Sequence, residues 1–208
     1  MTAVPYNPSM FLAILPEIGL VILAGLILMF DLIWKHKKDR DLGLLTFGGL
    51  LVITGIAVVF SRPAEPQLIF GGMLREDAAS FVFRVIFLMG AALTVLFSMD
   101  NEAFSRTGEY YVLVVVSTLG MNLMASAADL IMLYLAIETT SLPLYILAGS
   151  LTRDPKSVEA GIKYLLFGAL TSAVMLYGFS LLFGFSGTTQ IYQIAGKLQS
   201  GQISVVSV

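Results

Sequence analysis

Glu138 and Lys163 are ionisable residues that fall inside long apolar stretches of the sequence. A charge near the centre of a bilayer costs about 2.5–3.5 kcal/mol on insertion scales, so such residues need a partner or a role. Glu138 stands about eight residues into its stretch, or about 12 Å deep at the helical rise. An apolar setting favours the protonated carboxylic acid, and a nearby ammonium favours the carboxylate. The two residues together therefore predict reversible proton binding, the chemistry of a proton relay.

The neighbours of both residues leave alternatives open. Pro143 removes a backbone hydrogen bond and crowds the carbonyl of Thr139, which predicts a kink that admits water beside Glu138. Alternatively, Glu138 is a protonated structural donor between helices. Lys163 approaches Glu138 if the two helices are antiparallel, but Glu159 precedes Lys163 by four residues and is a competing partner on the same helix.

Other ionisable residues lie nearer the ends of apolar stretches. Asp31 is expected to pair with Lys35 on an exposed helix surface. Glu17 is expected to approach water at the outer surface, and Arg84 to extend to the interface or to meet Glu76 or Asp77.

The composition restricts the class of protein. Hydrophobic residues make up 57% of the 208 residues and charged residues only 12%, about half of what a soluble domain carries. The absence of cysteine excludes disulfides and thiolate sites, and the single histidine, His36, falls in a basic loop and makes no metal site. A net charge of −2 offers no basic surface for nucleic acid. A multi-pass membrane protein is the remaining class.

The elements that must position these residues are six apolar stretches long enough to cross a bilayer. The expected fold is an all-α, polytopic transmembrane helix bundle in one domain, 1–184, followed by an interfacial tail, 185–208. The six membrane spans are expected near 11–34, 42–60, 78–98, 110–127, 130–149 and 157–184. Asp129 is the predicted N-cap of the fifth span, and the fourth and fifth spans must be antiparallel neighbours because so few residues separate them.

Basic residues predict the orientation. The loops after the first, third and fifth spans hold seven Lys and Arg residues, and the opposite side holds three. The positive-inside rule then places these odd loops in the cytoplasm and the N-terminus outside.

About 80 consecutive residues carry a family likeness. The motifs include Glu109-Tyr110-Tyr111, Asp129-Leu130, Glu138 with Ser141-Leu142-Pro143-Leu144-Tyr145, and Lys163-Tyr164 before Gly168-Ala169. This stretch resembles helices four to six of antiporter-like subunit N of NADH-quinone oxidoreductase, respiratory complex I. The first 100 residues match that family only in hydropathy and helix count.

The resemblance implies a membrane-arm subunit of a proton-pumping complex in a bacterial inner membrane. Glu138 would take the role of the family's helix-five glutamate and Lys163 that of its helix-six lysine. This chain would bind no cofactor, whereas NADH, FMN, iron–sulfur clusters and quinone would belong to other subunits. Its expected partners are other membrane-arm subunits, the lipid bilayer and, through the complex, the quinone pool, with no nucleic acid.

The match also has a departure. The resemblance implies a fourteen-helix fold with two inverted repeats. This sequence offers only the N-terminal part of that fold, without counterparts for the lysines of helices seven, eight and twelve. A chain truncated before the next span is therefore expected to be inactive alone. The alternatives are a subunit of a cation/proton antiporter or membrane-bound hydrogenase, and a noncatalytic membrane scaffold or remnant.

Overall fold

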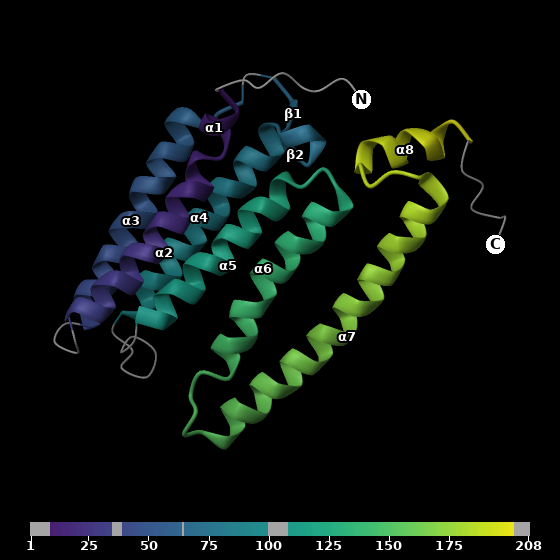
Figure 1. The fold of residues 1–208 in the computed structure, drawn as a ribbon. Helices are drawn as coiled ribbons and strands as arrows, with labels where there is room; N and C mark the ends of the chain where they lie inside the picture. The colour runs from purple at the N-terminus through teal and green to yellow at the C-terminus, as the bar shows by residue number, and fades with distance from the viewer. Residues whose placement is uncertain (1–8, 35–38, 64, 100–107, 202–208) are drawn as a thin grey trace.

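The computed structural model describes residues 9–34, 39–63, 65–99 and 108–201 (Figure 1). A two-stranded antiparallel hairpin consists of β1 (Gln67–Ile69) and β2 (Leu74–Glu76). The helices of the described part are α1 (Ser9–Ala13), α2 (Leu15–Trp34), α3 (Asp39–Phe60), α4 (Ala78–Ser98), α5 (Gly108–Ser126), α6 (Leu130–Ala148), α7 (Pro155–Ser186) and α8 (Ile191–Gln199).

Helices α2 to α7 are each long and apolar enough to cross a membrane. The expected all-α bundle with six spans is confirmed. The hairpin between α3 and α4 was not predicted, because its strands are only three residues long and follow a proline-rich break.

The expected first span is divided into α1 and α2. Pro16 has no amide hydrogen, so it cannot donate to the carbonyl of Leu12 one turn earlier. That carbonyl instead accepts a hydrogen bond of 3.0 Å from the hydroxyl of Ser61, just beyond the end of α3. The break in the helix thereby ties the beginning of α2 to the end of α3.

Helices α2, α3, α4 and α5 form a four-helix bundle with a continuous apolar core. Fully buried side chains from all four helices meet in it, among them Leu20, Leu50, Leu88 and Val115. Each helix packs against neighbours on two sides, so this bundle is the rigid part against which the later helices are placed.

Helix α6 packs closely along α5, and the expected antiparallel pairing is confirmed. The predicted cap is also confirmed, because the Asp129 side chain accepts a hydrogen bond of 2.9 Å from the amide of Ile131. Gly120 allows the close approach, since a Cβ at this position would lie 2.5 Å from the backbone nitrogen of Thr140.

Helix α7 lies at the edge of the molecule and contacts α6 mainly along the half nearer their connection (Figure 1). Near this connection the backbones of Gly149 and Gly161 are in contact, and a Cβ on Gly161 would lie 2.7 Å from the Cα of Gly149. Farther along, the rings of Tyr145 and Tyr164 meet edge to face at 4.7 Å between their centroids.

A clasp holds the far end of α7. We use this name for residues 71–75, 126–130 and 186–192, which join the hairpin, the α5–α6 turn and the α7–α8 connection. Backbone amides of Ala128, Leu130 and Ile191 donate to carbonyls across these segments at 2.9–3.0 Å. The guanidinium of Arg75 also lies over the ring of Tyr192, 4.5 Å from its centroid. Helix α7 is therefore fixed to α6 near its beginning and, through the clasp, to the hairpin and the α5–α6 turn at its end.

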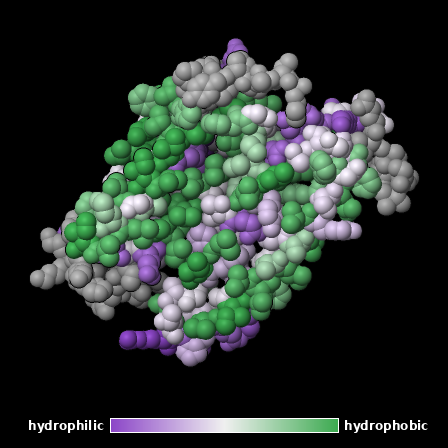
Figure 2. Space-filling model, viewed as in Figure 1, coloured by the Kyte–Doolittle hydropathy of each residue, from purple (hydrophilic) through white to green (hydrophobic). Residues whose placement is uncertain are grey.

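Apolar side chains dominate the visible surface, and hydrophilic residues gather beside α8 and near the beginning of α7 (Figure 2). Exposed large hydrophobic residues occur on α2, α3, α4, α6 and α7, whereas the apolar side chains of α5 are buried or half-buried. A surface of this kind is suited to lipid or to other apolar helices.

The α5–α6 contact generates a prediction about packing. Gly120→Ala forces the backbones of these two helices apart, and we expect it to lower the free energy of unfolding by about 1–3 kcal/mol. Gly178→Ala is the matched control on α7, because its Cβ meets nothing within 4 Å. Equilibrium unfolding in mixed micelles measures both variants, and equal stability of the two would show that Gly120 is not a close-packing position.

Candidate functional site

Glu138 lies in the ninth position of α6, a helix of 19 residues. It is therefore about 12 Å from the helix start, near the middle of the span. The side chain is half-buried, and its Oε1 atom is buried without a hydrogen-bond partner among the described residues. A buried polar atom of this kind is costly, by about 1–3 kcal/mol, unless a proton or water satisfies it.

Three hydroxyl groups next to Glu138 are occupied by the backbone of their own helix. Thr139, Thr140 and Ser141 each donate to the carbonyl four residues earlier at 2.8–2.9 Å. Hydrogen bonds of this type bend helices, as does Pro143 two residues beyond Ser141. The hydroxyls still carry acceptor lone pairs, so they can accept from water or from a protonated Glu138.

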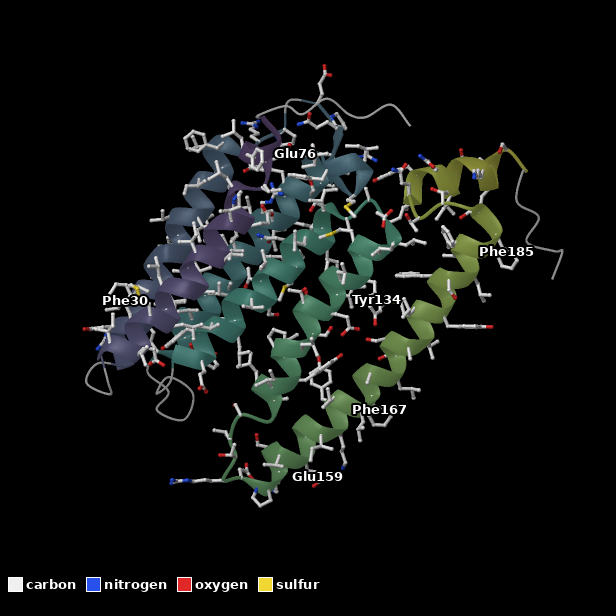
Figure 3. All side chains as sticks on the ribbon, in the orientation of Figure 1. Phe30, Glu76, Tyr134, Glu159, Phe167 and Phe185 are labelled. Carbon is white, nitrogen blue, oxygen red and sulfur yellow. The ribbon has the colours of Figure 1, made fainter. Side chains whose placement is uncertain are left out.

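Glu138 faces α7. It precedes Tyr145 by seven residues, which places the two side chains within about 20° of each other around α6. Tyr145 contacts α7 at Gly168 and Tyr164. Ser172 and Met175 lie four and seven residues beyond Gly168 on α7, which places them at about the level of Glu138. Both are half-buried. We call the space between these two helix faces the α6–α7 seam, and Figure 3 shows that Tyr134 of α6 also lies on this side.

Lys163 is exposed and pairs with its own helix. Its Nζ donates to Oε1 of Glu159, and both side chains are about two-thirds exposed. The sequence left the partner of Lys163 open between Glu138 and Glu159, and the structure pairs it with Glu159.

The structure does not bring Glu138 and Lys163 together. Glu138 lies seven residues from the Tyr145–Gly168 contact, and Lys163 lies five residues from it in the opposite direction. At the helical rise this separates their Cα atoms by about 18 Å along the helix axes. Lys163 is also rotated by about 140° from Gly168, away from the seam.

A buried ion pair joins α2 to α4. The Nε of Arg84 donates to Oε1 of Glu17 at 2.9 Å, and the side chains are 3% and 7% exposed. The expectations that Glu17 approaches water and that Arg84 extends to the interface or meets Glu76 or Asp77 are therefore wrong. The first and third spans run in the same direction, and each residue lies one or two turns from the same end of its span. That shared depth was a signal for the pair in the sequence.

The remaining ionisable candidates either pack against another helix or lie outside the described residues. Asp31 packs against the start of α5, where a Cβ on Gly108 would lie 2.6 Å from its Cγ. A carboxylate at a helix N-terminus is favourable. Its expected partner Lys35, together with His36, lies outside the described residues. Within the described ranges, no group of three or more acidic or histidine side chains could hold a metal ion.

Comparisons with known proteins find relatives of this chain. The family model described as "NADH:quinone oxidoreductase/Mrp antiporter, TM" matches residues 127–207, which include Glu138 and Lys163. NADH-quinone oxidoreductase subunit N of Rhodospirillum rubrum is 40% identical over 183 residues, and that of Anaeromyxobacter sp. is 38% identical over 197. Over about nine tenths of its own length, this chain is therefore similar to subunit N.

Subunit N of either bacterium is much longer than this chain. The matches cover 87% and 93% of the chain but only 38% of each relative. The structure of respiratory complex I from Thermus thermophilus contains a chain that is similar with a TM-score of 0.71 and 28% identity. That match covers 89% of this chain and 42% of the other. The fold described here therefore corresponds to about two fifths of a subunit N protein.

The two charge pairs generate contrasting stability predictions. Arg84→Met leaves the buried Glu17 carboxylate without its counter-charge, so we expect unfolding to become easier by about 3–5 kcal/mol. Lys163→Met breaks an exposed pair and should cost less than about 1 kcal/mol. Unfolding midpoints in mixed micelles compare the two variants, and similar losses would contradict the assignment of the buried pair as the stronger contact.

Proposed function

We propose that this chain contributes to proton translocation in the membrane arm of an NADH-quinone oxidoreductase. Glu138 carries the proposal, because its carboxyl lies near the middle of α6 with one buried oxygen that lacks a partner among the described residues. A carboxyl group held in this way can accept and release a proton, and its energy responds to nearby charges. The similarity to NADH-quinone oxidoreductase subunit N supports the reaction to which that proton transfer would be coupled.

The α6–α7 seam is the proposed location of the relay. Oε1 of Glu138, which has no partner within the described ranges, is on α6, and the hydroxyl of Tyr145 reaches Gly168 on α7 about two turns away. Lys163 is proposed to act on the relay through its ion pair with Glu159, since it does not contact Glu138. Electron transfer, with NADH, FMN, iron–sulfur clusters and quinone, would belong to other subunits.

Other membrane-arm polypeptides are the proposed partners. The membrane span of α7 is only 6% buried within this chain, and the Lys163–Glu159 pair lies on its exposed side. Lys163 lies about 12 Å from the start of α7, and a charge at that depth is unfavourable against lipid, which supports a covering protein surface there. We propose a bacterial inner membrane as the location, with the clasp on the outer side, as the distribution of basic residues predicts.

Glu138→Gln tests the function in the host membrane with the complex assembled. Glutamine keeps the shape and hydrogen bonding of the side chain but cannot exchange a proton at neutral pH. We expect proton uptake per NADH oxidised to fall several-fold, measured by a pH-sensitive dye in inverted vesicles alongside quinone reduction. Glu109→Gln is the control, because Glu109 is exposed at the beginning of α5. A normal ratio in the Glu138 variant would favour the scaffold interpretation.

Glu159→Gln separates the two parts of the proposed relay. If Lys163 acts through Glu159 and at a distance from Glu138, this variant should lower the proton-to-NADH ratio less than Glu138→Gln does. The same vesicle assay makes the comparison, with amounts of assembled complex matched by immunoblot. An equal or larger loss in Glu159→Gln would place the critical carboxyl beside Lys163 and not in the seam.

A further inference from the structure

The buried contact between Glu17 and Arg84 uses only part of their hydrogen-bonding capacity. One bond of 2.9 Å joins Arg84 Nε to Glu17 Oε1. Glu17 Oε2 and Arg84 Nη1 are also buried, and neither has a partner among the described residues. A guanidinium and a carboxylate often form two parallel hydrogen bonds when they pair. Here one bond is made, so one donor and one acceptor of the pair are left for another group.

A third polar side chain is buried on α5. Asn122 is 1% exposed, and its Oδ1 and Nδ2 are both buried without a partner in the described part of the chain. A primary amide accepts hydrogen bonds through its oxygen and donates through its nitrogen. A buried polar atom is costly when it makes no hydrogen bond. Four atoms on α2, α4 and α5 therefore have the same requirement for a partner.

The packing of α2 against α5 places Asn122 at the level of Glu17. Gly108 at the beginning of α5 lies against Asp31 near the end of α2, where a Cβ on the glycine would lie 2.6 Å from the Asp31 Cγ, so the two packed helices are antiparallel. Glu17 precedes Asp31 by 14 residues, and Asn122 follows Gly108 by 14 residues. Both intervals measure about 21 Å, so Glu17 and Asn122 lie at the same depth. Because 14 residues are two heptads, each helix returns to within about 40° of the contacting face.

The hairpin holds the beginning of α4 at the same end of α5. Leu74 of β2 pairs through its backbone with Ala127, directly after α5, and α4 begins four residues after Leu74. Arg84 lies about 9 Å into α4, and Asn122 lies about 6 Å before the end of α5. Val115, one heptad before Asn122, is fully buried in the core that α5 shares with α2 and α4. The face of α5 that carries Asn122 is therefore directed toward the two helices that hold the ion pair.

The four atoms are suited to a neutral ligand that both donates and accepts hydrogen bonds. None of them reaches a polar group of the described residues within hydrogen-bond distance, so they do not satisfy one another directly. Glu17 and Arg84 balance each other's charge, which leaves no net attraction for a cation or an anion. Water bridges polar groups that are too far apart for a direct bond, and it makes about three hydrogen bonds at a buried site.

We propose that Glu17, Arg84 and Asn122 form a binding site for an internal water molecule that links α2, α4 and α5. The water accepts a hydrogen bond from Arg84 Nη1 and donates one to Glu17 Oε2. Its third bond is with the side-chain amide of Asn122, which serves as donor or acceptor. The ligand completes the hydrogen bonding of the ion pair and connects it to a helix that the pair itself does not contact through a hydrogen bond.

This site is separate from Glu138. It is built by α2, α4 and α5, whereas Glu138 lies on α6 and faces α7. Asn122 is on the side of α5 away from α6, because it is rotated by about 160° from Gly120, where α5 and α6 are in contact. The inference rests on buried polar atoms and helix register, and it does not depend on the proposed function.

Solid-state NMR of the purified chain in lipid bilayers tests the site. The chain is labelled with ¹⁵N-asparagine, the signals of Asn122 are assigned by their loss in Asn122→Leu, and magnetisation is transferred from water protons to nitrogen. We expect transfer to the side-chain amide of Asn122 to be several-fold faster than transfer to the backbone amide of the same residue. The backbone amide is the internal control, because it lies inside α5 and donates within the helix.

A double variant tests whether the ion pair holds the water. Glu17→Met combined with Arg84→Met removes both charged partners together and keeps apolar volume in the core, so the bundle is retained. We expect transfer to the Asn122 side chain to become several-fold slower in this variant. Glu109→Gln is the control, because Glu109 is exposed at the beginning of α5, and it should leave the transfer rate unchanged.

Two results would overturn the proposal. The first is transfer to the Asn122 side chain that is no faster than transfer to its backbone amide, a measurement that leaves Glu17, Arg84 and Asn122 intact. The second is fast transfer that persists in the double variant, which would mean that water reaches Asn122 without the ion pair. Neither result bears on proton pumping through Glu138, so the two proposals fail independently.

Discussion

Glu17 and Arg84 are buried where water does not solvate them, and each is tolerated there because of the other. An ionised side chain among apolar helices is costly, and a single partner of opposite charge offsets much of that cost. The pair links α2 to α4. The same requirement for a partner governs the other ionisable residues in the spans and separates structural charges from candidate functional ones.

In the α6–α7 seam, Glu138 is accommodated without such a partner among the described residues. Glycine contacts close the seam near Gly149 and Gly161, and the clasp holds its far end through backbone hydrogen bonds. Glu138 lies between these two fixed ends, where α6 carries hydroxyl groups and a proline. A carboxyl oxygen with no partner in the described part of the chain persists there because packing elsewhere determines how α6 and α7 are placed.

The exposed side of α7 indicates contacts with another protein surface. Phe167 and Phe185 lie along this helix, away from the four-helix bundle, and both are at least half exposed (Figure 3). Apolar residues are compatible with lipid, but the exposed Lys163–Glu159 pair is not. The chain spans about two fifths of its subunit N relatives, so a protein surface over α7 is consistent with the length of those relatives.

Hydropathy and turn residues determined the six spans, the antiparallel α5–α6 pair and the Asp129 cap, because helix length in a bilayer and capping depend on residues close together in the sequence. They also placed Glu138 at mid-span. The partner of each charge was decided only by the tertiary structure. Glu17 pairs with Arg84, 67 residues away, and Lys163 turns away from Glu138 toward Glu159. Such pairings depend on the rotation and axial offset of packed helices, which for α6 and α7 are set by Gly149, Gly161 and the clasp through contacts between distant segments.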